Sequence, residues 1–365
     1  MSNDKQIKSI AVYRFLAMLL VVSGHLITVA TYSYEIVDVI KGPLSTPILT
    51  SNFLASFDGW AYSALHTNAG SLAVVMFFIA SGYLVSKMLD RYSRREFIIN
   101  RMLSVFPTLW VSLIVVASVV YFSQGIVYSP ADFLGSMFPF WPRISGAFVT
   151  LVLWTLRIEM KFYLLTFFFG KNRRALVIWG YMLILFLVLL YYEFRSPWVY
   201  TEMYDVSFMC FAFTGVVIEQ VQRKQDKNGL LKIATCVLTN LLLFKISVAV
   251  FQEDRGLYTS CLTHLVPVVL FLLLIEMEKA IPKLFERIPR WVYELSKWSM
   301  PVYCTHTGCG LNVMYWMSKM GCGLWLTILG GFFTAFVVAG VIYMLVTKPS
   351  GIYMKKVITT MRTKK

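Results

Sequence analysis

The chain has 365 residues, of which 58% are hydrophobic and only 15% are charged. Soluble proteins contain roughly 45–50% apolar and about 25% charged residues, so a soluble globule of this composition could not cover its apolar surface. Intrinsic disorder is excluded too, because it requires low hydrophobicity. What remains is an integral membrane protein, for which the net charge of +15 raises the question of sidedness and does not indicate a nucleic-acid partner.

Apolar segments long enough to cross a bilayer recur along the whole chain. A membrane helix needs about 20 mostly apolar residues, and ten segments meet this requirement, at residues 8–31, 72–88, 101–122, 149–169, 174–193, 206–222, 231–250, 257–276, 298–317 and 324–346. We therefore predict an all-α integral membrane fold, a bundle of about ten transmembrane helices that forms a single domain over residues 1–365. The connection 32–71 is predicted to be a loop, and residues 277–297 to hold a short interfacial helix.

Basic residues alternate between the predicted connections as the positive-inside rule requires. With the N-terminus inside, the inner segments hold 25 of the 34 lysines and arginines, the outer segments hold five, and four lie within helices. The outer segments also hold nine acidic residues. This asymmetry predicts that both termini are cytoplasmic.

The first predicted helix carries two ionisable residues, Arg14 and His25, and such side chains are costly inside a bilayer. At 100° per residue their separation of eleven positions makes three turns plus about 20°, so we expect both on one face, about 16 Å apart along the axis. A cation near the cytoplasmic end and a titratable base deeper in the membrane suit a long anionic ligand. Alternatively, Arg14 reaches toward lipid phosphates and His25 fills a helix–helix contact.

Glu159 is placed near the middle of the fourth predicted helix. Arg157 and Lys161 are each two residues away, which is 200° around a helix, so neither shares its face. Glu159 then needs a partner on another helix, or it is protonated. A buried carboxylate of this kind can orient or charge-stabilise a histidine, and a structural ion pair is the alternative.

Two further groups of residues are candidates for chemistry. Four arginines between residues 91 and 101 either bind phosphates by bidentate contacts or reflect the positive-inside rule alone. Tyr303 and His306 lie in the ninth predicted helix. The six cysteines form no CxxC pair, so we expect buried free thiols, and the sequence contains no metal-ligand motif and no nucleotide-binding or hydrolase motif.

These residues, in this order, resemble the acyltransferase 3 family of membrane acyltransferases. Six features carry the resemblance: Arg14 and His25 as an Arg-x10-His motif, residues 77–83 as an FFxxSG(F/Y) motif, Arg101 with Pro107, residues 154–163, residues 296–306, and Lys348 with Pro349. They span nearly the whole chain. The sequence differs from the family pattern at Ser104, where members often have a second arginine. It resembles the members that lack a fused hydrolase-like domain.

The resemblance implies an enzyme that transfers an acyl group, most often acetyl, from cytoplasmic acyl-CoA to a hydroxyl of a saccharide or glycolipid. We expect acetyl-CoA as a donor substrate with no permanently bound cofactor, an acceptor such as lipid-linked O-antigen, and a bacterial inner membrane location. The expected catalytic residues are His25, as general base or acyl carrier, and Glu159. The expected acyl-CoA-binding residues are Arg14, Ser81, Gly82 and Arg101, and the secondary residues are Trp154, Tyr303 and His306.

Two other functions remain open at this point. A transporter or flippase would also use intramembrane charges such as Arg14, Glu159 and Lys245, although the two halves of the chain show none of the repeat symmetry of many transporters. A structural scaffold would explain the topology but not the ordered motifs. Within the enzyme interpretation, an acetyl, succinyl or longer acyl group, and direct or covalent transfer, are alternatives.

Overall fold

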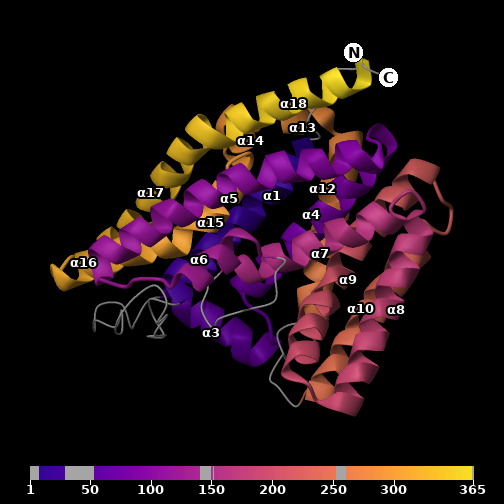
Figure 1. The fold of residues 1–365 in the computed structure, drawn as a ribbon, viewed down its shortest axis with the longest axis horizontal. Helices are drawn as coiled ribbons and strands as arrows, with labels where there is room; N and C mark the ends of the chain where they lie inside the picture. The colour runs from indigo at the N-terminus through magenta and orange to yellow at the C-terminus, as the bar shows by residue number, and fades with distance from the viewer. Residues whose placement is uncertain (1–7, 29–52, 140–148, 151, 252–259, 364–365) are drawn as a thin grey trace. The chain divides into compact units, whose positions relative to one another are not determined.

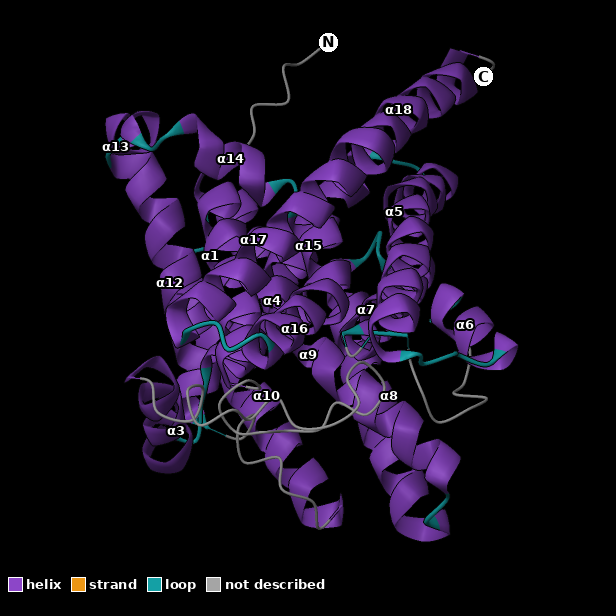
Figure 2. Ribbon diagram, turned by 90° about the vertical axis from the view of Figure 1, so that its left-hand side faces the viewer, coloured by secondary structure: helices purple, strands orange, loops and turns teal. Residues whose placement is uncertain are grey.

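The structure is a computed structural model that describes residues 8–28, 53–139, 149–150, 152–251 and 260–363. Within these residues every regular element is a helix and there is no strand, as the ribbon coloured by secondary structure shows (Figure 2). The predicted all-α fold is confirmed. The chain divides into two units, which are treated separately below: unit 1 comprises residues 1–21, 60–91 and 168–299, and unit 2 comprises residues 22–59, 92–167 and 300–365.

Eight helices of the described residues are long and apolar enough to cross a membrane. They are Lys8–Ile27, Ala69–Arg91, Arg94–Gln124, Arg173–Phe194, Trp198–Lys224, Gly229–Ser247, Cys261–Ala280 and Leu324–Thr363. Each overlaps one predicted segment. The fourth predicted segment forms a helix of 17 residues, Leu153–Phe169, and the ninth forms three consecutive helical pieces. The number of crossings and their sidedness therefore stay predictions.

Unit 1 is organised around one long central helix. Its elements are most of α1 (Lys8–Ser23), α4 (Ala69–Arg91), α8 (Arg173–Phe194), α9 (Pro197–Lys224), α10 (Gly229–Phe251), α12 (Cys261–Ala280), α13 (Pro282–Arg287) and α14 (Arg290–Ser296). Helix α9 packs against α4, α8 and α10, and α8, α9 and α10 lie side by side (Figure 1). Two short helices, α13 and α14, lie within residues 277–297, where one short helix was predicted, and its interfacial position stays a prediction.

The backbones of α4 and α9 approach each other closely because two glycines face the contact. A Cβ atom on Gly82 would lie 1.9 Å from the carbonyl oxygen of Ala212, and one on Gly215 would lie 2.1 Å from that of Ile79. Small residues permit such contacts between membrane helices. The glycine of the FFxxSG(F/Y) motif thus has a packing role in this structure.

The beginning of α1 is anchored by a carboxylate of α12. Glu278 accepts hydrogen bonds from the backbone N–H groups of Lys8 at 3.0 Å and Ser9 at 2.8 Å. The first N–H groups of a helix lack intrahelical partners, and a negative charge there is favoured by the helix dipole. One turn further on, the hydroxyl of Tyr13 donates to the carbonyl of Pro267 at 3.0 Å.

Unit 2 contains three π-helical segments. Its elements are η1 (Gly24–Thr28), α5 (Arg94–Gln124), α6 (Pro130–Met137), most of α7 (Leu153–Phe169), nearly all of α15 (Ser299–Thr305), η2 (His306–Leu311), α16 (Asn312–Lys319), α17 (Leu324–Ile342), η3 (Tyr343–Thr347) and α18 (Lys348–Thr363). Helix α17 packs against η1, η2 and η3, and η1 packs against η2. A π-helix is rare and often marks a functional site.

The tenth predicted segment ends at residue 346, but the helix continues to Thr363. The stretch Leu324–Thr363 has 40 residues, which is about 60 Å at 1.5 Å per residue and about twice the thickness of the hydrocarbon core. Helix α18 therefore extends beyond the apolar layer. It runs along α5 (Figure 1), where the Arg362 guanidinium bonds the Glu96 carboxylate at 2.7 Å.

Two helices were not predicted. Helix α3 (Phe53–Leu65), which lies across the boundary of the two units, replaces part of the loop predicted for 32–71, and α6 (Pro130–Met137) lies between two predicted segments. The loop prediction was wrong for residues 53–65, although residues 29–52 lie outside the described part of the chain. Phe53, Phe57 and Trp60 are exposed on α3, as expected of aromatic residues at a membrane interface.

Candidate functional site

Two histidines far apart in sequence are in direct contact in unit 2. The Nδ1 atom of His25 lies 2.8 Å from the Nε2 atom of His306, and the ring planes are 21° apart with their centroids separated by 5.0 Å. His306 is fully buried, whereas His25 is partly exposed. The pair therefore joins a fully buried histidine to one that keeps some solvent exposure as a residue.

The glycines of η2 allow this contact. A Cβ atom on Gly308 would lie 2.4 Å from Cγ1 of Val116 on α5, and one on Gly310 would lie 3.0 Å from Cδ2 of Leu26 on η1. A larger side chain at either position would push η2 away from its neighbours. Because η2 begins at His306, these two close approaches position the His306 ring.

The α15 helix supplies further neighbours of the pair. The Nδ1 atom of His306 lies 3.0 Å from the carbonyl oxygen of Val302 and 2.9 Å from that of Tyr303. The ring of Tyr303 has its centroid 6.0 Å from that of His306, and its hydroxyl lies 2.5 Å from Oγ1 of Thr155 on α7. Tyr303 thus links the histidine pair to α7.

One partner of Glu159 lies on its own helix. The hydroxyl of Tyr163, four residues further along α7, donates to Oε1 of Glu159, since residues i and i+4 are neighbours on a helix surface. The guanidinium of Arg101 on α5 lies over the Tyr163 ring, 5.4 Å from its centroid, and Nη1 is 3.5 Å from the Tyr163 hydroxyl. Tyr163 was not predicted as a partner, because only neighbours two residues away and residues on other helices were expected to decide the environment of Glu159.

The expected donor-binding residues other than Arg101 belong to unit 1. Nη2 of Arg14 donates to Oγ of Ser299 at 2.5 Å. Ser81 is partly exposed on α4, next to the buried Gly82. Helix α1 changes to π winding at Gly24, so the 100° per residue used to place Arg14 and His25 on one face does not apply to the last residues, and the shared face stays a prediction. Trp154, in unit 2, is partly exposed in the first turn of α7.

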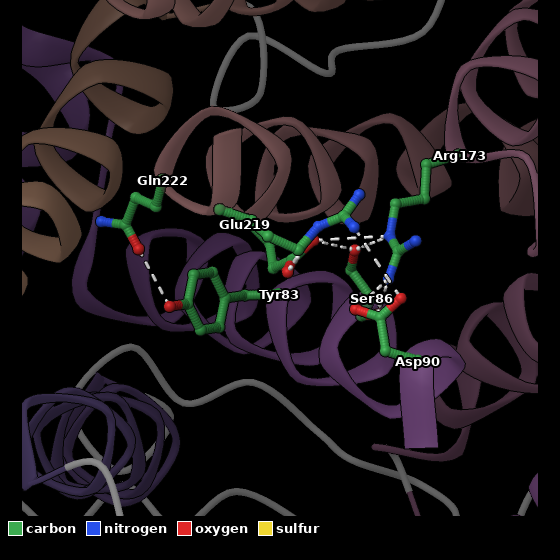
Figure 3. A network of polar contacts seen from close by, with 7 residues as sticks. Tyr83, Ser86, Asp90, Arg173, Glu219 and Gln222 are labelled. Carbon is green, nitrogen blue, oxygen red and sulfur yellow. Dashed lines mark hydrogen bonds and ion pairs between the residues drawn. The ribbon is translucent and has the colours of Figure 1, made fainter. Parts of the chain in front are cut away.

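A charged network in unit 1, centred on the buried Arg173 and Glu219 and drawn in Figure 3, was not predicted from the sequence. Arg173 pairs with Asp90 at 2.8 Å and with Glu219 at 3.4 Å, and it donates to Oγ of Ser86 at 2.9 Å. Arg223 also contacts Glu219, at 3.6 Å. These ion pairs join α4, α8 and α9. Glu219, inside a predicted membrane helix, was the signal that could have revealed the network.

The six cysteines are all free thiols. Four are buried as predicted, but Cys261 is exposed and Cys322 is partly exposed. Among the residues that the structure describes, no group of three or more histidine, cysteine, aspartate or glutamate side chains is arranged to hold a metal ion.

Apolar helices and a partly exposed histidine held by a buried one define a helical membrane protein with a candidate acid–base site. A family model described as an acyltransferase domain, that of the acyltransferase 3 family, matches residues 7–344. The chain therefore belongs to the acyltransferase 3 family and is an integral membrane acyltransferase, which confirms the resemblance found from its motifs. No curated protein and no solved structure matched the chain in the corresponding searches.

Proposed function

We propose that this enzyme transfers an acyl group, in the first instance acetyl, from acyl-CoA to a hydroxyl of a saccharide or lipid-linked glycan such as O-antigen, in a bacterial inner membrane. The observation that supports it best is the contact between His25 and His306 at 2.8 Å. A general base must be accessible to the substrate and held in one orientation. His25 meets the second requirement, because its ring is held by the hydrogen bond to His306, and the residue as a whole keeps some solvent exposure.

In the proposed reaction the acceptor hydroxyl oxygen attacks the thioester carbonyl carbon, and His25 takes the hydroxyl proton. The carbon–sulfur bond breaks, and the same proton then passes from His25 to the departing thiolate. The products are an ester and free CoA, so atoms and charge balance with donor and acceptor alone. A covalent route through an acyl-histidine would use the same ring nitrogen, and labelled acyl groups trapped on the protein would distinguish it.

The remaining roles follow from charge. CoA carries several phosphates, and guanidinium groups bind phosphate through bidentate contacts. We assign Arg14 and Arg101 to the acyl-CoA on this ground. Ser81, partly exposed on α4, is assigned to the passage of the acyl-pantetheine arm. Glu159 supports the site electrostatically, and its bond to Tyr163 holds its carboxylate next to an aromatic ring that also contacts Arg101.

The test is the substitution His25→Ala, with His66→Asn as the control. His66 is exposed and has a positive φ of 48°, which asparagine tolerates. Membranes containing each variant receive labelled acetyl-CoA and the saccharide acceptor, and the label on the glycan is measured together with protein level. We expect His25→Ala to lose about 10²–10⁴-fold in rate and the control to keep it.

Unchanged transfer by His25→Ala at normal protein level would remove His25 from the mechanism. If the wild-type protein leaves no label on any glycan, the acceptor class is wrong. A carrier that only moves a substrate across the membrane would likewise leave the glycan unlabelled.

A further inference from the structure

We propose that His306 is a positioning residue that fixes the neutral His25 ring in the form with hydrogen on Nδ1, so that Nε2 of His25 is the atom that takes the proton of the acceptor hydroxyl. The role of Nε2 rests on the proposed function. The choice between the two ring forms rests only on contacts within unit 2, and it is tested separately.

The first step concerns the proton on His306. Its Nδ1 atom lies within hydrogen-bonding distance of two backbone carbonyls, those of Val302 and Tyr303. A carbonyl oxygen accepts hydrogen bonds and cannot donate one. Nδ1 of His306 must therefore carry a hydrogen, because a bare nitrogen would place its lone pair against two oxygens inside a fully buried site, where unmatched polar groups are costly.

The second step transfers this constraint to His25. A neutral imidazole with hydrogen on Nδ1 has a lone pair on Nε2, and this atom of His306 faces Nδ1 of His25 at 2.8 Å. Two nitrogens at this distance share one hydrogen, so His25 donates its Nδ1–H to His306. The lone pair of His25 is then on Nε2, the nitrogen on the far side of the ring from His306.

This arrangement has a chemical consequence. The preferred ring form of a histidine is set by the hydrogen bond that its other nitrogen makes, and loss of such a partner gives a mixture of forms and orientations. Partners that orient a metal-bound histidine are typically worth about 10–100-fold in activity, and we expect the same range for this pair. His306 would contribute this factor without contacting the substrate.

Nuclear magnetic resonance of the full-length protein in lipid bilayers tests the ring form directly. The chain has only four histidines, so ring-¹⁵N-labelled histidine gives a simple spectrum in which protonated and bare ring nitrogens have different shifts. The His25→Gln spectrum assigns His25 by difference. We expect hydrogen on Nδ1 and a bare Nε2 in the wild-type His25 ring. Hydrogen on Nε2 of a neutral His25 would overturn the inference, whatever the activity of the enzyme.

Two substitutions of His306 test the consequence for turnover. The amide of His306→Gln extends to the place of Nε2 and offers an oxygen to the Nδ1–H of His25, whereas the amide of His306→Asn extends only to the place of Nδ1. We expect His306→Asn to lower kcat about 10–100-fold with little change in the KM for acetyl-CoA, and His306→Gln to keep most of kcat. Equal losses in both variants would mean that His306 acts through packing, and the inference would fail.

The two proposals fail in different ways. If His25→Ala keeps full transfer activity, the assigned role of His25 is wrong even where the spectrum shows hydrogen on Nδ1. If the spectrum shows hydrogen on Nε2 but His25→Ala is inactive, His25 remains the base and the positioning role of His306 is wrong.

Discussion

The substitution Arg173→Met tests whether the buried charged network of unit 1 holds its helices together. The guanidinium of Arg173 is only 8% exposed and pairs with Asp90 at 2.8 Å and Glu219 at 3.4 Å. It also donates to the backbone carbonyl of Ser86 at 2.7 Å. Methionine replaces the unbranched apolar stem of Arg173 but lacks the guanidinium, so it makes none of these bonds.

The expected loss of stability follows from the carboxylates that Arg173→Met leaves without this partner. The Glu219 carboxylate is 3% exposed, and breaking a buried pair by removing one partner costs about 3–5 kcal/mol. Arg223 lies 3.6 Å from Glu219 but is 43% exposed, so it offsets only part of this. For a chain of this size we expect the melting temperature to fall by about 4–6 °C.

The assay is the apparent melting temperature of the detergent-purified protein at one fixed heating rate, because unfolding of such proteins is commonly irreversible. The neighbouring Arg174 is exposed, so Arg174→Met is the matched control, expected to change the free energy of unfolding by less than about 0.5 kcal/mol. Adding Glu219→Gln to Arg173→Met removes the stranded charge and should recover much of the loss. Equal melting temperatures for Arg173→Met and Arg174→Met would refute the reasoning.

Two other variants probe the site. Gly308→Ala should lower the free energy of unfolding by about 1–3 kcal/mol and reduce transfer, because its Cβ would meet Val116 at 2.4 Å. Adding Val116→Ala should restore part of the stability and part of the rate. If neither recovers, this contact is not the cause of the loss. Arg14→Ala should raise the KM for acetyl-CoA about tenfold or more. Ser299→Ala, which keeps the Arg14 cation, should change this KM less than about threefold. Similar KM values for the two variants would argue against phosphate binding by Arg14.

The sequence predicted the helical segments well because a bilayer imposes a simple rule. A spanning segment must satisfy its backbone internally and present apolar side chains, and both requirements are readable residue by residue. Helix α3 was not predicted, because a helix that does not cross the membrane need not meet this rule. Gly59, together with prolines earlier in the connection, favoured a loop. Its aromatic residues at 53, 57 and 60 were the available signal, since they recur at helical spacing.

The candidate site was predicted in its residues but not in its contacts. Sequence order identified His25 and His306 separately, and only the packing of η1 against η2 brings them together. Fixed helical winding could not foresee the π turn at Gly24. Gly82 shows a different limit, because its motif suggests a passage for the donor while its backbone packs against α9, so loss of activity in Gly82→Ala would not by itself demonstrate a binding role.

The π winding of η2 makes the length of this segment matter as much as its composition. A π turn takes five residues per hydrogen-bond step where an α turn takes four, so deleting one residue between Thr305 and Asn312 would favour ordinary α winding. Side chains on the two sides of the deletion would then rotate by about 100° relative to each other. Either His306 would leave His25, or Asn312 would lose the bond that Ser123 donates to it at 2.5 Å. When helices are exchanged between such enzymes, the number of residues in η2 should therefore be kept even where their identities change.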